Sequence, residues 1–351
     1  MRLKSIAIPA AETREKLRKR SGLSSAAGIV VMCILASVGA PLARATGAQD
    51  DAAANRPAMH AFTDETGRRV NVPAQVNRIV SLAPNLTEIV FALKQENHLA
   101  GDTDYCDYPP EAARKPHVGG PVNPNLEEIV KLRPDLILAT SINRRETVAA
   151  LDRLGLPVYI TDPHSVDEMI ASIERLGGVL GADKNAAALA GELRSRLADL
   201  GRRLAGAQPA RAFFVVWTDP LISIGRGTFL EDALRHAGAR SVVETSTEWP
   251  RVNLEEMLRL QPEFLVFVGE HTGQAREEID ALRSRPGWRD LDALRQGKVA
   301  IINEAIIRPV PRIVDAIEQL ARSLHPQLFA ARAGSGGISG PIAQEACSCI
   351  R

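Results

Sequence analysis

Short apolar runs rich in Val and Ile alternate with amphipathic segments along most of the chain from Arg78 onward. The apolar runs are predicted to be strands, and they lie at 78–83, 135–140, 157–161, 211–217, 263–269 and 299–303. Segments with helical periodicity follow Asn85, Asn125, Asn143, Thr228, Asn253 and Arg312. Because strand and helix alternate at this spacing, the pattern predicts an α/β fold with two lobes, each built on a parallel sheet.

The stretch between the two series of strands, 165–206, is almost continuously helical in pattern, with one interruption around 177–183. We expect a single long backbone helix to join an N-terminal lobe at 78–164 to a C-terminal lobe at 207–330. A helix cannot hinge as a pair of flexible strands can, so the lobes should move little against each other.

The first 45 residues differ in sequence pattern from the rest of the chain. A basic stretch at 14–20 precedes an apolar run at 26–40, and Ala43-Arg44-Ala45 then offers a small-x-small cleavage site. This pattern is typical of an export signal, so we expect residues 1–45 to be removed and the mature chain to lie in the periplasm. An anchor that stays uncleaved is the weaker alternative, because the run is shorter than the roughly 20 residues that span a bilayer.

Two further segments complete the predicted organisation. Residues 46–77 are expected to form an N-terminal extension with lead-in strands. The Gly- and Ser-rich segment 331–351 is expected to be a flexible tail.

The chain of 351 residues is 45% hydrophobic and 24% charged, with a formal net charge of +1. It is therefore globular, and no basic face indicates a nucleic-acid partner. Cys106, Cys347 and Cys349 are too few for a disulfide framework, and the histidines show no metal-binding spacing. Only His271, just beyond a predicted strand, is considered as a ligand to a metal centre. No catalytic nucleophile with its base is found, so the pattern favours a binding protein over an enzyme.

One short unit occurs twice in the chain. The stretch 125–139 reads NLEEIVKLRPDLILA, and 253–267 reads NLEEMLRLQPEFLVF. In each copy the Asn is a good N-cap and the proline ends the helix before the next strand. Because helix N-termini lie at the same end of a parallel sheet as the strand C-termini, both units should begin on the side of the ligand cleft between the lobes.

The paired glutamates of the two units have different expected roles. Glu128 and Glu256 stand where a capping box would reach back to the N–H of the cap residue. Glu127 and Glu255 are left to face outward, either as simple N-terminal helix charges or as contacts for a partner. Their occurrence in both copies favours the partner.

Aromatic residues make up only 4% of the chain, yet Tyr105, Tyr108, Trp217 and Trp249 all fall in loops that follow predicted strands. Large flat side chains there suit a large, partly apolar ligand, although packing at the base of a loop is the open alternative. Arg308 lies beside the two prolines of RPVPR, which prevent a regular helix and are expected to hold this arginine toward the cleft. A solvated arginine is the open alternative.

Several of these segments together resemble the periplasmic cobalamin-binding proteins of ABC importers, over about residues 62–328. These proteins lie within the helical-backbone class that also carries ferric siderophores and haem. The resemblance rests on RIVSLAPNLTEIVFAL, TDYCDYPPEA, NPNLEEIVKLRPDLILA, LGLPVYI and WPRVNLEEMLRLQPEFLVF. It implies that Glu127 and Glu255 bridge to arginines of the membrane subunits of the transporter.

The resemblance also implies roles for residues in the cleft. Tyr105 and Trp249 match a tyrosine and a tryptophan that face the ligand, whereas Glu304 and Arg308 match side chains that hydrogen-bond the periphery of the corrin ring. Pro121 departs from the pattern, because these binding proteins can carry another cleft tryptophan there. The identity of the ligand is therefore left open.

We expect a monomeric periplasmic receptor that binds cobalamin or a related corrinoid, without a cofactor or a metal site of its own, and delivers it to an ABC permease. The alternative within the class is a ferric siderophore or haem, with Tyr105 or His271 as an iron ligand in the haem case. A third hypothesis is an exported metal-dependent hydrolase, which would need clustered metal ligands.

Overall fold

The computed structural model describes residues 58–269 and 272–330. The predicted export signal, the tail with its two cysteines, and His271 lie outside these residues. Within the described ranges, no helix is both long enough and apolar enough to cross a membrane.

The N-terminal lobe is built on a parallel four-stranded sheet in the order β4-β3-β5-β6. A hairpin of β1 (Met59–Thr63) and β2 (Arg69–Pro73) precedes the sheet, as expected for lead-in strands. The other elements of the lobe are β3 (Ile79–Ser81), α1 (Pro84–Ala92), β4 (Leu99–Gly101), η1 (Ala112–Arg114), α2 (Leu126–Lys131), β5 (Leu136–Thr140), α3 (Arg145–Arg153) and β6 (Val158–Thr161).

The C-terminal lobe has a second parallel four-stranded sheet, in the order β10-β7-β11-β12. Its strands are β7 (Ala210–Val215), the small hairpin β8 (Trp217–Thr218) and β9 (Leu221–Ile222), β10 (Ala239–Ser241), β11 (Phe264–Val268) and β12 (Val299–Ile302). Its helices are α6 (Phe229–His236), α7 (Leu254–Leu260), α8 (Thr272–Ser284), η2 (Trp288–Asp290), α9 (Asp292–Arg295), η3 (Glu304–Ile307), α10 (Ile313–Leu324) and α11 (Pro326–Phe329).

The two sheets share one topology. Leaving the β8–β9 hairpin aside, the strands of each lobe lie in the order second, first, third, fourth along the chain. By this correspondence α2 matches α7, and β5 matches β11. The doubled sequence unit is therefore the same element in each lobe, and the predicted two-lobe α/β fold is confirmed.

The predicted N-caps of the doubled unit are confirmed. The side-chain oxygen of Asn125 accepts hydrogen bonds from the backbone N–H groups of Glu127 at 3.0 Å and Glu128 at 3.3 Å. The side-chain oxygen of Asn253 accepts one from the N–H of Glu256 at 2.6 Å. Each cap satisfies helix donors that would otherwise lack a partner.

The capping box predicted for α2 is wrong. The N–H of Asn125 donates to the carbonyl of Val118 at 2.7 Å, which leaves Glu128 no donor to reach back to. The Glu128 carboxylate instead accepts from Lys131 at 2.6 Å, one turn along the helix. The preceding loop, rather than the capping box, therefore fixes where this helix begins.

Both copies of the unit end in the same unusual backbone conformation. Arg133 has a φ of 46° and Gln261 a φ of 39°, and each immediately precedes a proline. A following proline excludes the right-handed helical region, so the chain leaves it sharply at both positions. A residue with a side chain in the left-handed region costs about 1 kcal/mol. Both lobes keep this strained conformation because the turn directs the chain into the central sheet.

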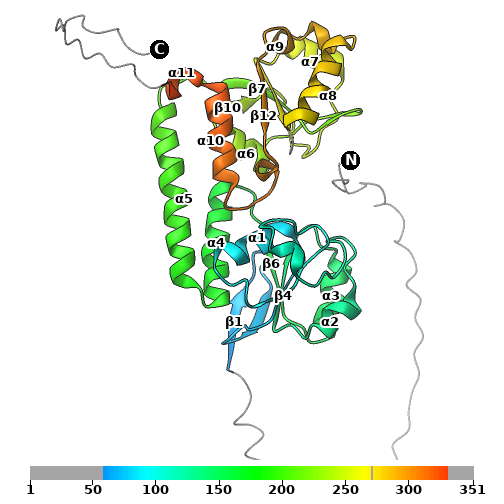
Figure 1. The fold of residues 1–351 in the computed structure, drawn as a ribbon, viewed down its shortest axis with the longest axis vertical. Helices are drawn as coiled ribbons and strands as arrows, with labels where there is room; N and C mark the ends of the chain where they lie inside the picture. The colour runs from blue at the N-terminus through cyan, green and yellow to red at the C-terminus, as the bar shows by residue number, and fades with distance from the viewer. Residues whose placement is uncertain (1–57, 270–271, 331–351) are drawn as a thin grey trace, which may run out of the picture. The chain divides into compact units, whose positions relative to one another are not determined.

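The connection between the lobes corrects the expectation of one continuous helix. The segment forms two helices, α4 (Val166–Leu180) and α5 (Asp183–Leu204), which pack side by side (Figure 1). Gly181 between them adopts a φ of 67°, and this left-handed cap ends α4. The long link is therefore α5 alone, which spans about 33 Å at the usual helical rise.

The start of α4 is fastened to the C-terminal lobe. The N–H of Val166 donates to the carboxylate of Asp232 on α6 at 2.8 Å. Burial alone would raise the pKa of Asp232, but hydrogen bonds from His236, the Val166 N–H and Arg235 lower that pKa to about 2. This carboxylate is thus charged at neutral pH and caps a helix that is distant in sequence.

The apolar core is continuous across the link. One cluster of buried side chains draws on both sheets and on α4, α5 and α10, and it includes Leu138 of β5 and Phe214 of β7. Their sheet neighbours Ile137 and Phe213 point to the opposite faces and belong to separate clusters, one in each lobe. Period-two alternation therefore gives every sheet one face toward the link and one face toward its own outer helices.

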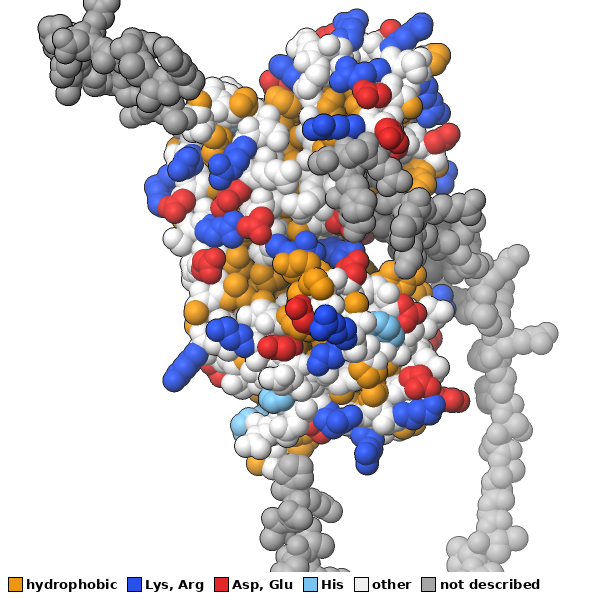
Figure 2. Space-filling model, in the orientation of Figure 1, with side chains coloured by type: hydrophobic (Ala, Val, Ile, Leu, Met, Phe, Trp, Pro, Cys, Tyr) orange, Lys and Arg blue, Asp and Glu red, His pale blue; other side chains and the backbone are white. Residues whose placement is uncertain are grey.

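The surface shows no segregation of charge on the face in view. Lys and Arg side chains are interspersed with Asp and Glu side chains over both lobes (Figure 2). This distribution agrees with the net charge of +1.

A close backbone approach at Gly225 predicts a large loss of stability on substitution. A methyl group at this position would lie 1.9 Å from the carbonyl oxygen of Thr247 and 2.9 Å from that of Thr245. We expect Gly225→Ala to lower the free energy of unfolding in urea by at least about 3 kcal/mol. The matched control is Gly191→Ala in α5, where nothing lies within 4 Å and the better helix former should add about 0.5 to 1 kcal/mol. Similar effects of the two substitutions would contradict the close approach.

Candidate functional site

The predicted tyrosines lie on a loop at the carboxyl end of β4. We call residues 103–109 the aromatic loop. Tyr105 and Tyr108 are 42% and 45% exposed, which is high for such large side chains. The base of the loop is fixed because Asp104 donates its N–H to the carbonyl of Gly119 at 3.1 Å.

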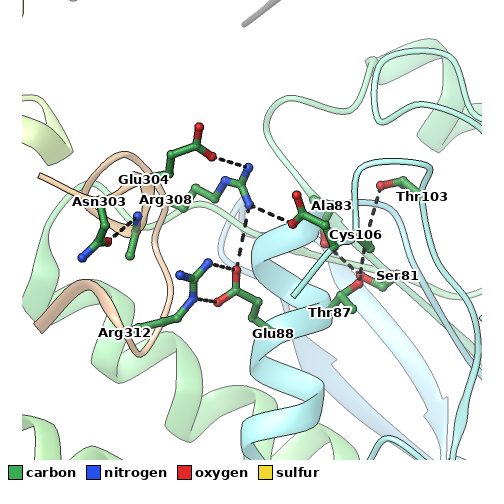
Figure 3. A network of polar contacts seen from close by, with 12 residues as sticks. Ser81, Ala83, Thr87, Glu88, Thr103, Cys106, Asn303, Glu304, Arg308 and Arg312 are labelled. Carbon is green, nitrogen blue, oxygen red and sulfur yellow. Dashed lines mark hydrogen bonds and ion pairs between the residues drawn. The ribbon is translucent and has the colours of Figure 1, made fainter. Parts of the chain in front are cut away.

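The aromatic loop is also fastened to the first turns of α1. The hydroxyl of Thr87 donates to Ser81 at 2.8 Å and lies 3.2 Å from the sulfur of Cys106 (Figure 3). The hydroxyl of Thr103 lies at the same distance from that sulfur. Burial raises the pKa of the Cys106 thiol to about 11, so the thiol stays protonated and acts as a packed, hydrogen-bonded anchor.

The predicted tryptophans differ in exposure. Trp217 of β8 is 46% exposed, and its ring N–H donates to the carbonyl of Asp219 at 2.7 Å. Trp249 is only partly exposed and packs against the central apolar cluster, so core packing accounts for at least part of its surface. The end of the β8–β9 hairpin runs beside the segment that follows Trp249, because Ser223 donates its N–H to the carbonyl of Pro250 at 3.1 Å.

Glu304 begins η3 and Arg308 follows it, at the carboxyl end of β12. The side chain of Asn303 accepts from the N–H of Ala305 at 2.9 Å and so caps this short helix. Arg308 then adopts an extended backbone before Pro309, as the proline pattern predicts. One guanidinium nitrogen of Arg308 lies 3.4 Å from the Glu304 carboxylate.

The same guanidinium reaches the N-terminal lobe. A second nitrogen of Arg308 lies 3.6 Å from the carboxylate of Asp107 in the aromatic loop and 4.0 Å from that of Glu88 on α1. The side chain of Arg308 is 25% exposed. Arg308 is thus surrounded by three carboxylates, two of which belong to the other lobe.

A second arginine makes the closest contact between the lobes. Arg312 donates to the two carboxylate oxygens of Glu88 at 2.7 and 2.8 Å (Figure 3). Its guanidinium carbon lies 3.9 Å from the centroid of the Tyr108 ring. Hydrogen bonding to Glu88 raises the pKa of Arg312 above its ordinary value. Glu88 itself is 3% exposed, so this pair is a shielded ion pair rather than a surface one.

The structure thus brings together three of the six predicted ligand residues, Tyr108, Glu304 and Arg308. Tyr105 lies on the aromatic loop, Trp217 in β8, and Trp249 in the segment between β10 and α7. The sequence analysis missed Glu88, Asp107 and Arg312 as partners of the site. The one signal for Glu88 is its position inside the apolar helix pattern NLTEIVF, where a charge needs a partner.

The predicted docking residues are both exposed. Glu127 and Glu255 stand in the first turns of the matching helices α2 and α7. Neither carboxylate has a hydrogen bond or an ion pair to another residue of the described chain. In α2 both Glu127 and Glu128 donate a backbone N–H to the Asn125 cap, whereas the Asn253 cap of α7 accepts from Glu256.

Two surface hollows lie away from this group. One of about 680 Å³ lies between β10 and α7, and the other, of about 670 Å³, lies at the end of α5 beside α11. Neither is lined by a predicted ligand residue. Within the described ranges, no three His, Cys, Asp or Glu side chains are grouped as metal ligands would be.

The chain is similar to known periplasmic binding proteins. The sequence profile of a family described as periplasmic binding protein matches residues 79–305. The vitamin B12-binding protein of Vibrio cholerae is 30% identical over 259 residues, which cover 72% of this chain and 90% of that protein. The uncharacterized ABC transporter substrate-binding lipoprotein YvrC of Bacillus subtilis is 28% identical over 324 residues, or 89% of this chain and 99% of that protein.

Solved structures of periplasmic binding proteins are also similar to this chain. The periplasmic vitamin B12 binding protein BtuF of Vibrio cholerae matches with a TM-score of 0.62 and 28% identity, over 73% of this chain and 99% of that one. The periplasmic haem-binding protein BhuT, solved with two haems, matches with a TM-score of 0.65 and 26% identity, over 72% of this chain and 98% of that one.

Asp102, at the base of the aromatic loop, is fully buried. One carboxylate oxygen lies 2.8 Å from Nδ1 of His117, and the other has no hydrogen-bond partner among the described residues. Burial raises the pKa of Asp102 to about 6, against the opposing effects of His117 and Lys115. The carboxyl group therefore changes charge near neutral pH.

This raised pKa predicts a pH-dependent stability. Because folded Asp102 keeps its proton up to about pH 6 and the unfolded residue releases it near pH 4, its contribution to stability is lost as the pH rises between these values. The free energy of unfolding of the wild type, relative to Asp102→Asn, should fall across this window by up to about 3 kcal/mol. Urea unfolding at a series of pH values measures it, with Asp183→Asn at the exposed start of α5 as control. Parallel pH profiles for the wild type and Asp102→Asn would refute the prediction.

Proposed function

We propose, since the chain belongs to the periplasmic binding protein family, that it captures cobalamin or a related corrinoid in the periplasm and delivers it to the permease of an ABC importer. Proteins of this family are substrate-binding subunits and not enzymes. The proposed ligand site lies where the aromatic loop faces Glu304 and Arg308.

The charge balance of the contacts between the lobes is the observation that carries the choice of ligand. Both arginines there already face carboxylates, and among the described residues of the group three carboxylates stand against two arginines. Its members are Glu88, Asp107, Glu304, Arg308 and Arg312. A ligand that presents carboxylates needs cations that are not yet paired, whereas peripheral amides both donate and accept hydrogen bonds. The site therefore favours an amide-rich corrinoid over an anionic chelate.

The exposed aromatic side chains support a ligand with a large flat ring. Tyr105, Tyr108 and Trp217 are each more than 40% exposed. Burying such side chains against a ring system contributes about 25 cal/mol for each Å² of apolar surface removed from water. This gain does not depend on ligand charge, so it complements the polar group.

Haem is the second candidate, and the structural similarity to BhuT together with the exposed tyrosines favours it over other chelates. A phenolate of Tyr105 or Tyr108 is a possible iron ligand. Against haem, its two carboxylates would meet a group that already carries excess negative charge.

A panel of coloured ligands decides between these candidates. Purified protein is incubated separately with cyanocobalamin, haemin and ferric siderophores, and the visible spectrum is recorded after desalting. We expect one equivalent of cyanocobalamin to be retained and the other ligands to be lost. Retention of haemin or a siderophore in its place would overturn the corrinoid assignment, whereas no retention of any ligand would overturn the proposed function.

The delivery step predicts a separation of uptake from binding. Glu127 and Glu255 are exposed and form no ion pair with another described residue. Glu127→Ala with Glu255→Ala should therefore leave cyanocobalamin affinity within about twofold and reduce permease-dependent uptake at least about tenfold. The matched control is Glu128→Ala with Glu256→Ala, one residue farther along each helix, which should retain most uptake. Calorimetry measures the affinity and labelled ligand the uptake. Normal uptake by the first double variant would rule out docking through these residues.

A further inference from the structure

Among the polar contacts between the two lobes of the described chain, the contact between Glu88 and Arg312 has the shortest donor-acceptor distances. Both donor-acceptor distances are below 2.9 Å, the fork is bidentate, and the carboxylate is almost fully buried. Bidentate arginine-carboxylate pairs fix relative orientation as well as distance. This pair therefore sets how α1 of one lobe faces the segment before α10 of the other.

Arg312 also touches the proposed ligand site. The guanidinium carbon of Arg312 lies over the ring of Tyr108, 3.9 Å from its centroid, a cation–π contact that holds the ring against this arginine. The aromatic loop is thus held at two points. Cys106 is held from within its own lobe by Thr87, and Tyr108 is held by Arg312 of the opposite lobe.

The neighbouring Arg308 is held much more loosely. Its nitrogens lie 3.4 to 4.0 Å from three different carboxylates, and none of these contacts is bidentate. A guanidinium at such distances loses little when it exchanges a carboxylate for a ligand acceptor. The two arginines, four residues apart, therefore differ in how readily they can exchange partners.

We propose that Arg312 is a positioning residue of the ligand site, held by Glu88, which fixes the aromatic loop across the lobes and leaves Arg308 as the arginine that exchanges its partners for the ligand. This inference rests on the proposed function, because it assigns these roles within the same site. Arg312 acts through Tyr108 and does not itself contact the ligand.

The substitution Arg312→Lys tests this role with little risk to the fold. Lysine keeps the positive charge beside Glu88 but loses the fork and the flat face. We expect the dissociation constant for cyanocobalamin to rise about tenfold. The matched control is Arg194→Lys in α5, which alters an equally bidentate but exposed pair with Glu174, at 2.6 and 2.7 Å, and should leave the dissociation constant unchanged.

A double-mutant cycle with Tyr108→Ala separates positioning from mere stabilisation. If Arg312 acts through Tyr108, Arg312→Lys should weaken binding little further once the ring is absent, so the two effects are not additive. Full additivity, or an unchanged dissociation constant with a lower free energy of unfolding, would show a purely structural salt bridge and overturn the proposal.

Hydrogen exchange without ligand keeps the inference testable if cyanocobalamin does not bind. In Arg312→Lys the backbone amides of the aromatic loop should exchange faster than in the wild type, while those of β5 and β11 should not change. Unchanged exchange in the aromatic loop would overturn the positioning role whatever the ligand. Failure of the ligand panel alone would overturn only the proposed function.

Discussion

The buried carboxylate of Glu88 constrains how the two lobes can meet. A charge with 3% exposure must keep a cation beside it, because leaving it unpaired would cost several kcal/mol. That cation, Arg312, belongs to the other lobe and lies against Tyr108. The desolvated pair therefore couples the geometry of the lobes to the side chains that would touch a ligand. Arg308, with longer contacts to three carboxylates, completes the group without sharing this constraint.

Local sequence signals predict the repeated architecture well. The central strands are hydrophobic runs with clear ends, and Asn125 and Asn253 are caps whose side chains satisfy helix donors. The prediction fails where tertiary structure competes with a local rule. Val118 occupies the N–H that a capping box at Glu128 would use, and Gly181 divides the expected single helix. The hydrogen bond to Val118 and the left-handed conformation of Gly181 both depend on the backbone geometry of the folded chain, which helical periodicity does not encode.

The candidate site is harder to predict from the sequence than the fold. Patterns along one lobe place Tyr108 and Arg308 in loops after strands, but they carry no information about partners 200 or more residues away. Glu88 and Arg312, separated by 224 positions, could be paired only after both lobes were built. Trp249 illustrates the opposite problem, because an aromatic residue in a loop can pack into the core, as this one does in part. Residue type and loop position therefore identify candidate ligand residues. Contacts in three dimensions then show which of them lie at the site and which pack into the core.

The long sequence separation of the pair between the lobes also has a consequence for the order of folding. Each sheet pairs strands that are close along the chain, whereas the Glu88–Arg312 contact closes a loop of 224 residues. The entropy lost on closing a loop grows with its length, so such a contact gains most once α5 and both sheets have already shortened the effective loop. We therefore expect the lobes to form as separate nuclei and the pair that joins them to close late. By the same reasoning, it is the contact through which the native molecule can first open.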